Sequence, residues 1–213
     1  MYRLHCFSQS GNCFKVAFML RALGQPYEAV YLDYLNGATR DPGWRATSNE
    51  MGEAPVLQDG DRVLTQSGAI LTWLARRHGA FGGASENEQQ EVLRWLLYDN
   101  HKFTSYFASY RFTKSFGPNA PDPAVMDWLR TRVETAFGIV NGHLAKQAFM
   151  VGAAPSIADF SMSAYLFYPR EESGIDVAAQ FPQIGAWLQR LRQVPGWGDP
   201  YDILPGARVA PRW

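Results

Sequence analysis

The chain has 213 residues, 46% of them apolar and 19% charged, which is enough for one large domain or two modest ones with a buried core. Basic and acidic residues number 20 each, so the formal charge is zero and the basic surplus of nucleic-acid and anionic-membrane binders is absent. No apolar run approaches the roughly 18 to 20 residues of a membrane span, and the N-terminus lacks a signal-peptide pattern, so we expect a soluble cytoplasmic protein.

Short apolar runs alternate with amphipathic stretches up to residue 79. The expected elements are a strand at Leu4–Phe7, a helix at Phe14–Leu23, a strand at Ala29–Leu32, a short helix at Pro42–Ser48, strands at Pro55–Leu57 and Arg62–Thr65 around an Asp-Gly hairpin turn, and a helix at Ala69–Arg77. A strand–helix–strand start requires a parallel pair, and the hairpin adds an antiparallel edge. We therefore expect an α/β thioredoxin-like domain, βαβαββα, with a mixed four-stranded sheet.

Residues 80–85 contain a Gly-Gly pair and are predicted to link this domain, residues 1–79, to an all-α helical bundle, residues 86–213. Beyond the linker, strand patterns disappear and apolar residues recur at helical spacing. The predicted helices are Glu88–Ser115, Ala124–Ala148, one that begins at Ser156, and Phe181–Val194.

Four segments resemble the cytosolic glutathione transferase family, in the family's order and over nearly the whole chain. They are Ser8–Val16, Asn49–Leu57 around a proline that the family holds in cis, Gln66–Leu71 at the turn that binds the γ-glutamyl group, and Ser156–Phe160, a Ser-x-x-acid capping box. The first segment is similar to bacterial members near the theta and nu classes.

The resemblance implies that Ser10 activates glutathione. Glutathione attacks only as the thiolate, whereas a free thiol has a pKa near 8.5. A donated hydrogen bond and a helix N-terminus stabilise the anion, and lowering the pKa by two units requires about 2.7 kcal/mol. Because Ser10 precedes the first predicted helix, a simple helix cap is the alternative interpretation.

Three neighbours of Ser10 lie in the same segment. The resemblance places the side-chain amide of Asn12 near the same sulfur, with a cap or turn residue as the alternative, and Ser8 is the fallback for the hydroxyl role. Cys13 is not at the position where beta-class transferases carry a cysteine, so we expect a small helix residue, and a redox role is the alternative. With Cys6 it makes two cysteines, too few for a disulfide framework or a zinc site, and we expect no metal.

The resemblance also implies contacts to the glycine end of glutathione. Ala54, before a cis Pro55, would pair its backbone with the extended ligand like an added strand. Glu53 belongs to the same segment, although a carboxylate does not help to hold the glycine carboxylate. Arg40, or else Arg45, is the expected cation, and a solvated surface charge is the alternative for Arg40.

Gln66 and Ser67 are expected to bind the γ-glutamyl end, because Ser67 opens a helix and helix N-termini bind carboxylates. A simple N-cap is the alternative. Asp99 is a candidate to reach across a dimer to the γ-glutamyl ammonium, and the alternative is a solvated helix face.

The helical domain is expected to hold a small hydrophobic electrophile. Aromatic side chains that could line its pocket, or belong to the ordinary core, are Tyr106, Tyr110, Phe112, Tyr165 and Phe167. The implied protein is a homodimeric glutathione transferase of detoxification, with glutathione as co-substrate and no bound cofactor. The alternatives are a glutathione-dependent disulfide reductase or peroxidase, and a non-catalytic scaffold with this fold.

Overall fold

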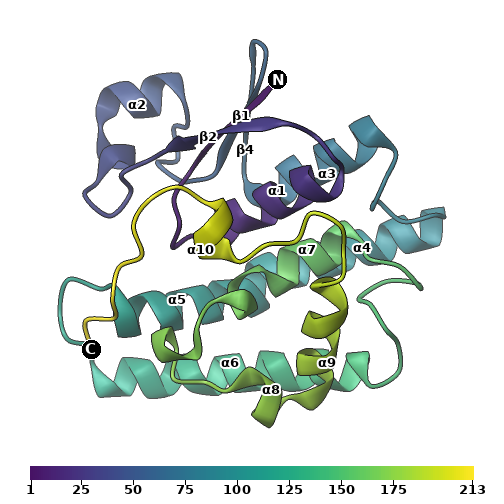
Figure 1. Ribbon diagram of the computed structural model, residues 1–213. Coiled ribbons are helices and arrows are strands. Elements are labelled where there is room, and N and C mark those ends of the chain that lie inside the picture. Colours follow the sequence, from purple (N-terminus) through teal and green to yellow (C-terminus); the bar gives the residue numbers. More distant parts are fainter. The chain divides into compact units, whose positions relative to one another are not determined.

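The computed structural model describes residues 1–213, which divide into two compact units (Figure 1). The first unit comprises Met1–Ala80 and Val194–Arg208, and the second comprises Phe81–Gln193 and Val209–Trp213. The sequence placed the boundary at residues 80–85 but assigned everything beyond it to the helical domain. In the structure Val194–Arg208 packs with the first unit, because its short helix α10 (Pro200–Ile203) lies against the first helix of the chain.

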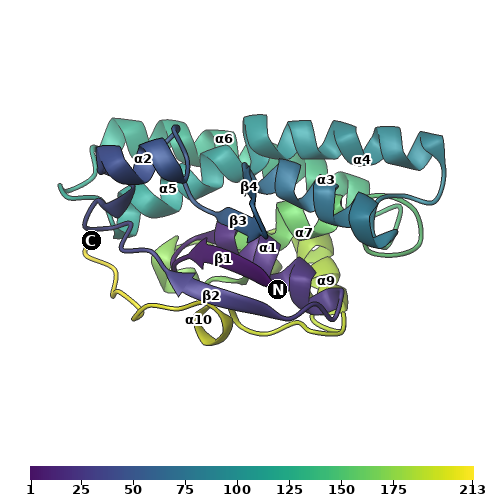
Figure 2. The same cartoon turned by 90° about the horizontal axis from the view of Figure 1, so that it is seen from above.

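The first unit contains the mixed four-stranded sheet that the sequence predicted. Its elements are β1 (Tyr2–Cys6), α1 (Gly11–Ala22), β2 (Tyr27–Tyr31), the 3-10 turn η1 (Ala38–Arg40), α2 (Pro42–Thr47), β3 (Val56–Asp59), β4 (Arg62–Thr65) and α3 (Ser67–His78). The strand order is β2-β1-β3-β4, with β1 parallel to β2 and the other two pairs antiparallel (Figure 2). The predicted parallel start and antiparallel hairpin are both confirmed.

The core of the first unit lies between the sheet and α1. Leu4 in the centre of β1 is fully buried and stands opposite Ala29 of β2 and Leu57 of β3. Helix α1 contacts β1, α3 and α10, and Phe14 and Phe18 are fully buried along it. Each such side chain stabilises the fold by about 1.5–3 kcal/mol. This packing fixes where α1 begins, and its N-terminus is part of the candidate site.

The second unit is all-helical, as predicted. Its elements are α4 (Glu86–Tyr98), the π-helical turn η2 (Asp99–Phe103), α5 (Thr104–Ser115), α6 (Pro123–Leu144), α7 (Ile157–Ser163), the 3-10 turns η3 (Ala164–Phe167) and η4 (Arg170–Glu172), α8 (Val177–Gln180) and α9 (Pro182–Leu191). Helices α5 and α6 pack side by side (Figures 1 and 2). The long helical stretch expected at Glu88–Ser115 is confirmed, and its central turn η2 is π-helical.

The predicted capping box is present at the start of α7. Asp159 is fully buried and accepts hydrogen bonds from the backbone and hydroxyl of Ser156, both at 2.9 Å. The backbone N–H of Met150 and the indole of Trp187 also donate to it, both at 2.8 Å. Burial raises the pKa of Asp159, and these four donors oppose the shift.

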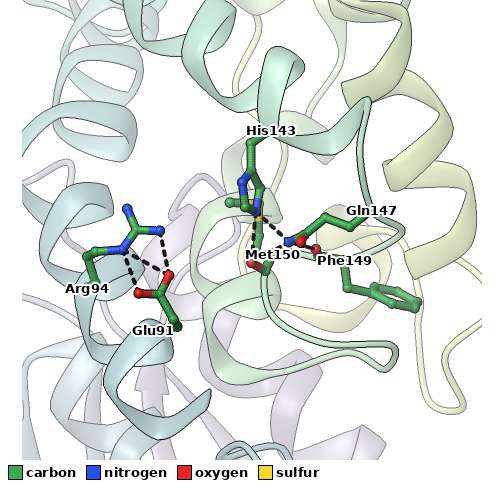
Figure 3. A network of polar contacts seen from close by, with 6 residues as sticks. All are labelled: Glu91, Arg94, His143, Gln147, Phe149 and Met150. Atoms are coloured by element: carbon green, nitrogen blue, oxygen red, sulfur yellow. Dashed lines mark hydrogen bonds and ion pairs between the residues drawn. The ribbon is translucent and has the colours of Figure 1, made fainter. Parts of the chain in front are cut away.

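A second polar network adjoins this one at Met150 (Figure 3). The carboxamide of Gln147 donates to the carbonyls of Phe149 and Met150 at 2.7 and 2.9 Å, and the ring of His143 contacts the Met150 carbonyl at 2.9 Å. The end of α6 is thereby tied to the loop that precedes α7.

Candidate functional site

The loop between β1 and α1 ends in a serine that caps the helix. Ser10 has extended backbone angles, φ −93° and ψ 109°, and its Oγ accepts the backbone N–H of Cys13 at 3.1 Å. Its side chain is nearly buried, with 5% of the residue exposed. The cap interpretation is therefore correct. It does not exclude the other one, because a hydroxyl that accepts a hydrogen bond still has its own proton to donate.

The residues before Ser10 are tied to the C-terminal segment. The carboxamide of Gln9 donates to the carbonyl of Ala207 at 2.7 Å, and the Ser8 hydroxyl lies 3.4 Å from the same oxygen. Ser8 is fully buried. A buried hydroxyl directed at a backbone carbonyl is poorly placed to activate a ligand, so this arrangement disfavours Ser8 relative to Ser10. The sequence assigned no role to Gln9, and no local pattern could reveal a partner 198 residues away.

The N-termini of α1 and α3 are joined by a hydrogen bond. The hydroxyl of Ser67, the first residue of α3, donates to Oδ1 of Asn12 at 3.4 Å. Two segments that the sequence singled out separately thus meet in one place. Gln66 occupies the N-cap position of α3 with φ 64° and ψ 108°. A non-glycine residue at positive φ is strained, and such strain is frequent at ligand sites.

The start of α3 has no side-chain cap. No side chain accepts from its first turn, and no acidic residue lies there. A helix leaves its first N–H groups without intrahelical partners, and together with the helix dipole they form a site for an anion. The N-terminus of α3 is therefore suited to a carboxylate, beside the hydroxyl of Ser67.

The loop before β3 adjoins Gln66. The Gln66 carboxamide donates to Oε2 of Glu53 at 2.7 Å, and Asn49 donates to the Glu53 carbonyl at 2.8 Å. The Ala54–Pro55 peptide is cis. Because the Gln66 side chain is engaged by Glu53, its position is set from within the protein, and Glu53 acts on the site through Gln66.

The two candidate cations differ in their surroundings. The guanidinium of Arg45 on α2 donates to the carbonyl of Met51 at 3.3 Å, on the loop that carries Ala54. It also lies close to Gly52, where a Cβ would be 2.5 Å from Nη2, and the φ of +70° favours glycine at this position. Arg40 is exposed and makes no side-chain hydrogen bond or ion pair. The geometry thus favours Arg45, the second choice of the sequence.

Neither cysteine is a thiolate at neutral pH. Both thiols are fully buried, and burial raises the pKa of Cys13 to about 12, although hydrogen bonds with Ser10 and Phe7 oppose the shift. Burial raises the pKa of Cys6 as well. These values support the interpretation of Cys13 as a small interior helix residue, and a nucleophile at this site must come from a ligand.

The prediction that Asp99 reaches across a dimer is wrong, and so is the alternative of a solvated face. Asp99 is fully buried at the start of the π turn η2. Its carboxylate accepts the Ser161 hydroxyl at 2.6 Å, the Thr104 backbone N–H at 3.2 Å and the Thr104 hydroxyl. A carboxylate held by three internal donors is not available to a ligand of another subunit, because exposing it would break all three bonds.

The aromatic candidates for the electrophile pocket have different environments. On α5, Tyr106 is half-buried beside Lys102, Tyr110 is buried, and Phe112 is 41% exposed. Tyr165 and Phe167 on η3 are buried. Exposure thus separates Phe112 and Tyr106, which a ligand could touch, from the three positions in the core.

Two further structural findings concern membrane-spanning helices and metal sites. No helix is long and apolar enough to cross a membrane. No group of three or more His, Cys, Asp or Glu residues is arranged to hold a metal ion.

Comparison with known families matches the two parts of the chain to the two domains of one family. Residues 4–85 match the family described as glutathione S-transferase, N-terminal domain, and residues 101–195 match the glutathione S-transferase, C-terminal domain. The crystal structure of a glutathione S-transferase from Pseudomonas fluorescens is similar, with a TM-score of 0.84 and 32% identity over 93% of this chain and 98% of that one.

Similar sequences among curated proteins include further glutathione S-transferases. Glutathione S-transferase 3 of Zea mays is 27% identical and covers 95% of this chain and 94% of its own length. Elongation factor 1-gamma 3 of Oryza sativa is 24% identical and covers 78% of this chain but only 40% of its own. The proteins similar to this chain thus include glutathione S-transferases and an elongation factor 1-gamma.

Proposed function

This chain belongs to the glutathione S-transferase family, and we propose that it is a catalytic member, which activates glutathione as a thiolate for attack on a hydrophobic electrophile. One observation carries the proposal: the capped N-terminus of α1 and the uncapped N-terminus of α3 meet at the 3.4 Å hydrogen bond between Asn12 and Ser67. Two helix N-termini in contact favour a ligand with more than one anionic group, and glutathione carries a thiolate and two carboxylates.

Each candidate residue has a role in this proposal. The hydroxyl of Ser10 donates to the glutathione sulfur, and the amide of Asn12 assists it. Ser67 and the first N–H groups of α3 hold the γ-glutamyl carboxylate, while Gln66, oriented by Glu53, shapes this end. The backbone of Ala54, before Pro55, pairs with the cysteinyl part of glutathione. Arg45 or Arg40 supplies the cation for the glycine carboxylate.

The chemical step needs only glutathione and the electrophile. The thiol loses its proton to solvent, and the thiolate forms a bond to the electrophilic carbon while the leaving group departs with its electron pair. The donated hydrogen bond and the helix dipole stabilise the thiolate, which raises its population at neutral pH. Glutathione is a co-substrate in this scheme, and no resident cofactor takes part.

The electrophile is assigned to the helical residues. Tyr106 and Phe112 are the leading contacts on α5, with Tyr110 and Tyr165 behind them. The enzyme in this proposal is a cytoplasmic homodimer of the detoxifying type.

A second candidate is a non-catalytic scaffold of the same fold. The similarity to elongation factor 1-gamma 3 favours it. A scaffold has no need of an uncapped helix N-terminus beside a serine and an asparagine, which is why the catalytic interpretation is preferred.

The test is glutathione binding by calorimetry, with ultraviolet titration of the bound thiol, for the wild type and Ser10→Ala. The variant should still bind glutathione, with the thiol pKa raised by about 1–2 units and conjugation of an aromatic halide slowed by about 10–100-fold. Ser85→Ala is the matched control, because Ser85 caps α4 through the Glu88 N–H at 3.2 Å in the same way. Both variants should lose about 1 kcal/mol of stability, and only Ser10→Ala should shift the thiol pKa.

Other outcomes decide between the alternatives. An unchanged thiol pKa in Ser10→Ala would transfer the role to Asn12. Turnover of bis-hydroxyethyl disulfide or cumene hydroperoxide without aromatic halide conjugation would indicate a reductase or peroxidase. A wild type that does not bind glutathione would contradict the proposal and support the scaffold.

A further inference from the structure

The C-terminal segment, residues 194–208, is tied to α1 at both of its ends. At the C-terminal end of α1, the guanidinium of Arg21 donates to the carbonyl of Gly196 at 2.6 Å. At the N-terminal end, Gln9 donates to the carbonyl of Ala207 at 2.7 Å. Between these anchors, α10 packs against α1. The segment therefore forms a brace along the helix whose N-terminus carries Ser10.

The brace is closely fitted where it reaches the Ser8–Ser10 loop. Gly206 has φ +105°, and a Cβ there would lie 2.7 Å from Cε2 of Tyr31 and 3.5 Å from Oγ of Ser8. Only glycine fits this backbone. The next residue, Ala207, presents its carbonyl to Gln9, which is itself 93% buried. The bond thus joins a nearly buried side chain to the exposed backbone of Ala207, which follows the restricted turn at Gly206.

The conformation of Ser10 depends on the position of Gln9. The backbone N–H of Ser10 donates to the Phe7 carbonyl at 3.2 Å, which closes a tight turn, and Ser10 then caps α1. The peptide plane between Gln9 and Ser10 therefore sets the direction of the Ser10 side chain. Misplacement of a reacting group by about 1 Å can cost on the order of 100-fold in rate.

We propose that Gln9 is a positioning residue, which fixes the Ser10 hydroxyl for the glutathione sulfur by anchoring the loop to the Ala207 carbonyl. The inference rests on the proposed function. It adds the C-terminal segment to the residues that determine thiolate activation. Gln9 acts through Ser10 and makes no contact with the reacting atoms in this scheme.

The test compares Gln9→Met with Gln25→Met. Methionine keeps the length of the side chain and removes its amide donors. Gln25 is the matched control, since its carboxamide donates to the Leu23 carbonyl at 3.3 Å at the other end of α1. The readouts are the pKa of the bound glutathione thiol, kcat and KM for glutathione, and the circular dichroism spectrum as a measure of folding.

Gln9→Met should raise the bound thiol pKa by about 0.5–1 unit, which at a pH below that pKa lowers the thiolate population and kcat about 3–10-fold. KM for glutathione should stay within about twofold, because the binding groups on α3 and the loop before β3 are untouched. Gln25→Met should leave all of these values at the wild-type level.

A second variant acts from the other side of the same bond. Gly206→Ala should displace the Ala207 carbonyl and raise the thiol pKa in the same direction. If both variants act through this bond, the double variant should lose no more than the larger single loss. This variant also serves as the test if Gln9→Met fails to fold.

The outcomes separate this inference from the function on which it rests. An unchanged thiol pKa in Gln9→Met and Gly206→Ala, together with a raised one in Ser10→Ala, overturns the positioning role and leaves the proposed function intact. An unchanged pKa in all three variants overturns the positioning role and transfers thiolate activation from Ser10 to Asn12. No glutathione binding by the wild type overturns both the positioning role and the proposed function.

Discussion

The buried carboxylates of the second unit and the polar groups of the candidate site in the first unit differ in how fully they are hydrogen-bonded. In the second unit, three carboxylates are fully buried, and each is held by internal donors: Asp99, Asp159 and Glu172. In the first unit, the polar groups of the candidate site range from buried (Ser10 and Ser67) to exposed (Gln66), and they are only partly engaged. Asn12 and Ser67 share one long hydrogen bond, and the start of α3 has no side-chain cap.

This contrast distinguishes structural polar groups from functional ones. A buried carboxylate without partners costs several kcal/mol, so the second unit satisfies each of its own. Groups that retain donors or protons for another molecule must stay near the surface, where water can satisfy them until the ligand arrives. The family resemblance pointed to polar residues in both units. Only the hydrogen bonds of Asp99 show that it is a structural polar group and not a functional one.

The largest effect is expected from breaking the buried ion pair of the second unit. Arg111 and Glu172 are 3% and 0% exposed, with Nη2 2.5 Å from Oε2, and Arg111 also lies over the ring of Tyr168 at 3.9 Å. Glu172→Gln removes the charge that compensates Arg111 and should lower the free energy of unfolding by about 3–5 kcal/mol in urea.

The matched control is Glu134→Gln, which breaks the exposed Arg130–Glu134 pair and should change stability by less than about 0.5 kcal/mol. Glutathione affinity below the unfolding transition should be unchanged in both variants. Equal effects of the two substitutions on stability would contradict the assignment of a structural role to burial.

The next prediction tests whether the Cys13 thiol in the first unit is as fully shielded from water as the carboxylates of the second unit. The pKa of Cys13 is raised to about 12 in the folded state, so the folded thiol keeps a proton that the unfolded thiol loses above its ordinary pKa of 9.0. Titration of Cys13 should therefore leave the free energy of unfolding unaffected below pH 9 and lower it with rising pH between 9 and 12, by about 1.4 kcal/mol per unit from this thiol alone.

The measurement is urea unfolding at pH 8 and pH 10.5 for the wild type and Cys13→Ala. The alanine variant should be less stable at both values but should lose less between them. A wild type and variant with the same loss between the two pH values would show that Cys13 does not titrate as a buried thiol.

The smallest effect is expected from a residue with spare hydrogen-bonding capacity. Ser67→Ala removes a 3.4 Å hydrogen bond to Asn12 and the hydroxyl proposed to hold the γ-glutamyl carboxylate. Glutathione should bind about 5–10-fold more weakly by calorimetry, while the free energy of unfolding changes by less than about 1 kcal/mol.

Thr72→Ala is the control on the same helix, because the Thr72 hydroxyl donates to the Gly68 carbonyl at 2.8 Å. It should leave glutathione affinity at the wild-type level. A large loss of stability with unchanged affinity in Ser67→Ala would reverse the contrast between the two units.

The sequence by itself determined the local features of the fold. The Asp-Gly turn predicted the β3–β4 hairpin, Ser10 and Ser156 marked helix starts, and the change from mixed to helical patterns at residues 80–85 marked two kinds of architecture. These features depend on interactions within about four residues of each other, such as caps and turns, and they can therefore be read along the chain.

Only the tertiary structure decided which polar residues meet. The Asn12–Ser67 bond spans 55 residues and the Gln9–Ala207 bond 198, so neither has a local pattern. The burial of Asp99 follows from a π turn and from Ser161 on another helix. Such contacts depend on how whole elements pack, because a side chain's partner is chosen by the packed fold and not by its neighbours in the chain.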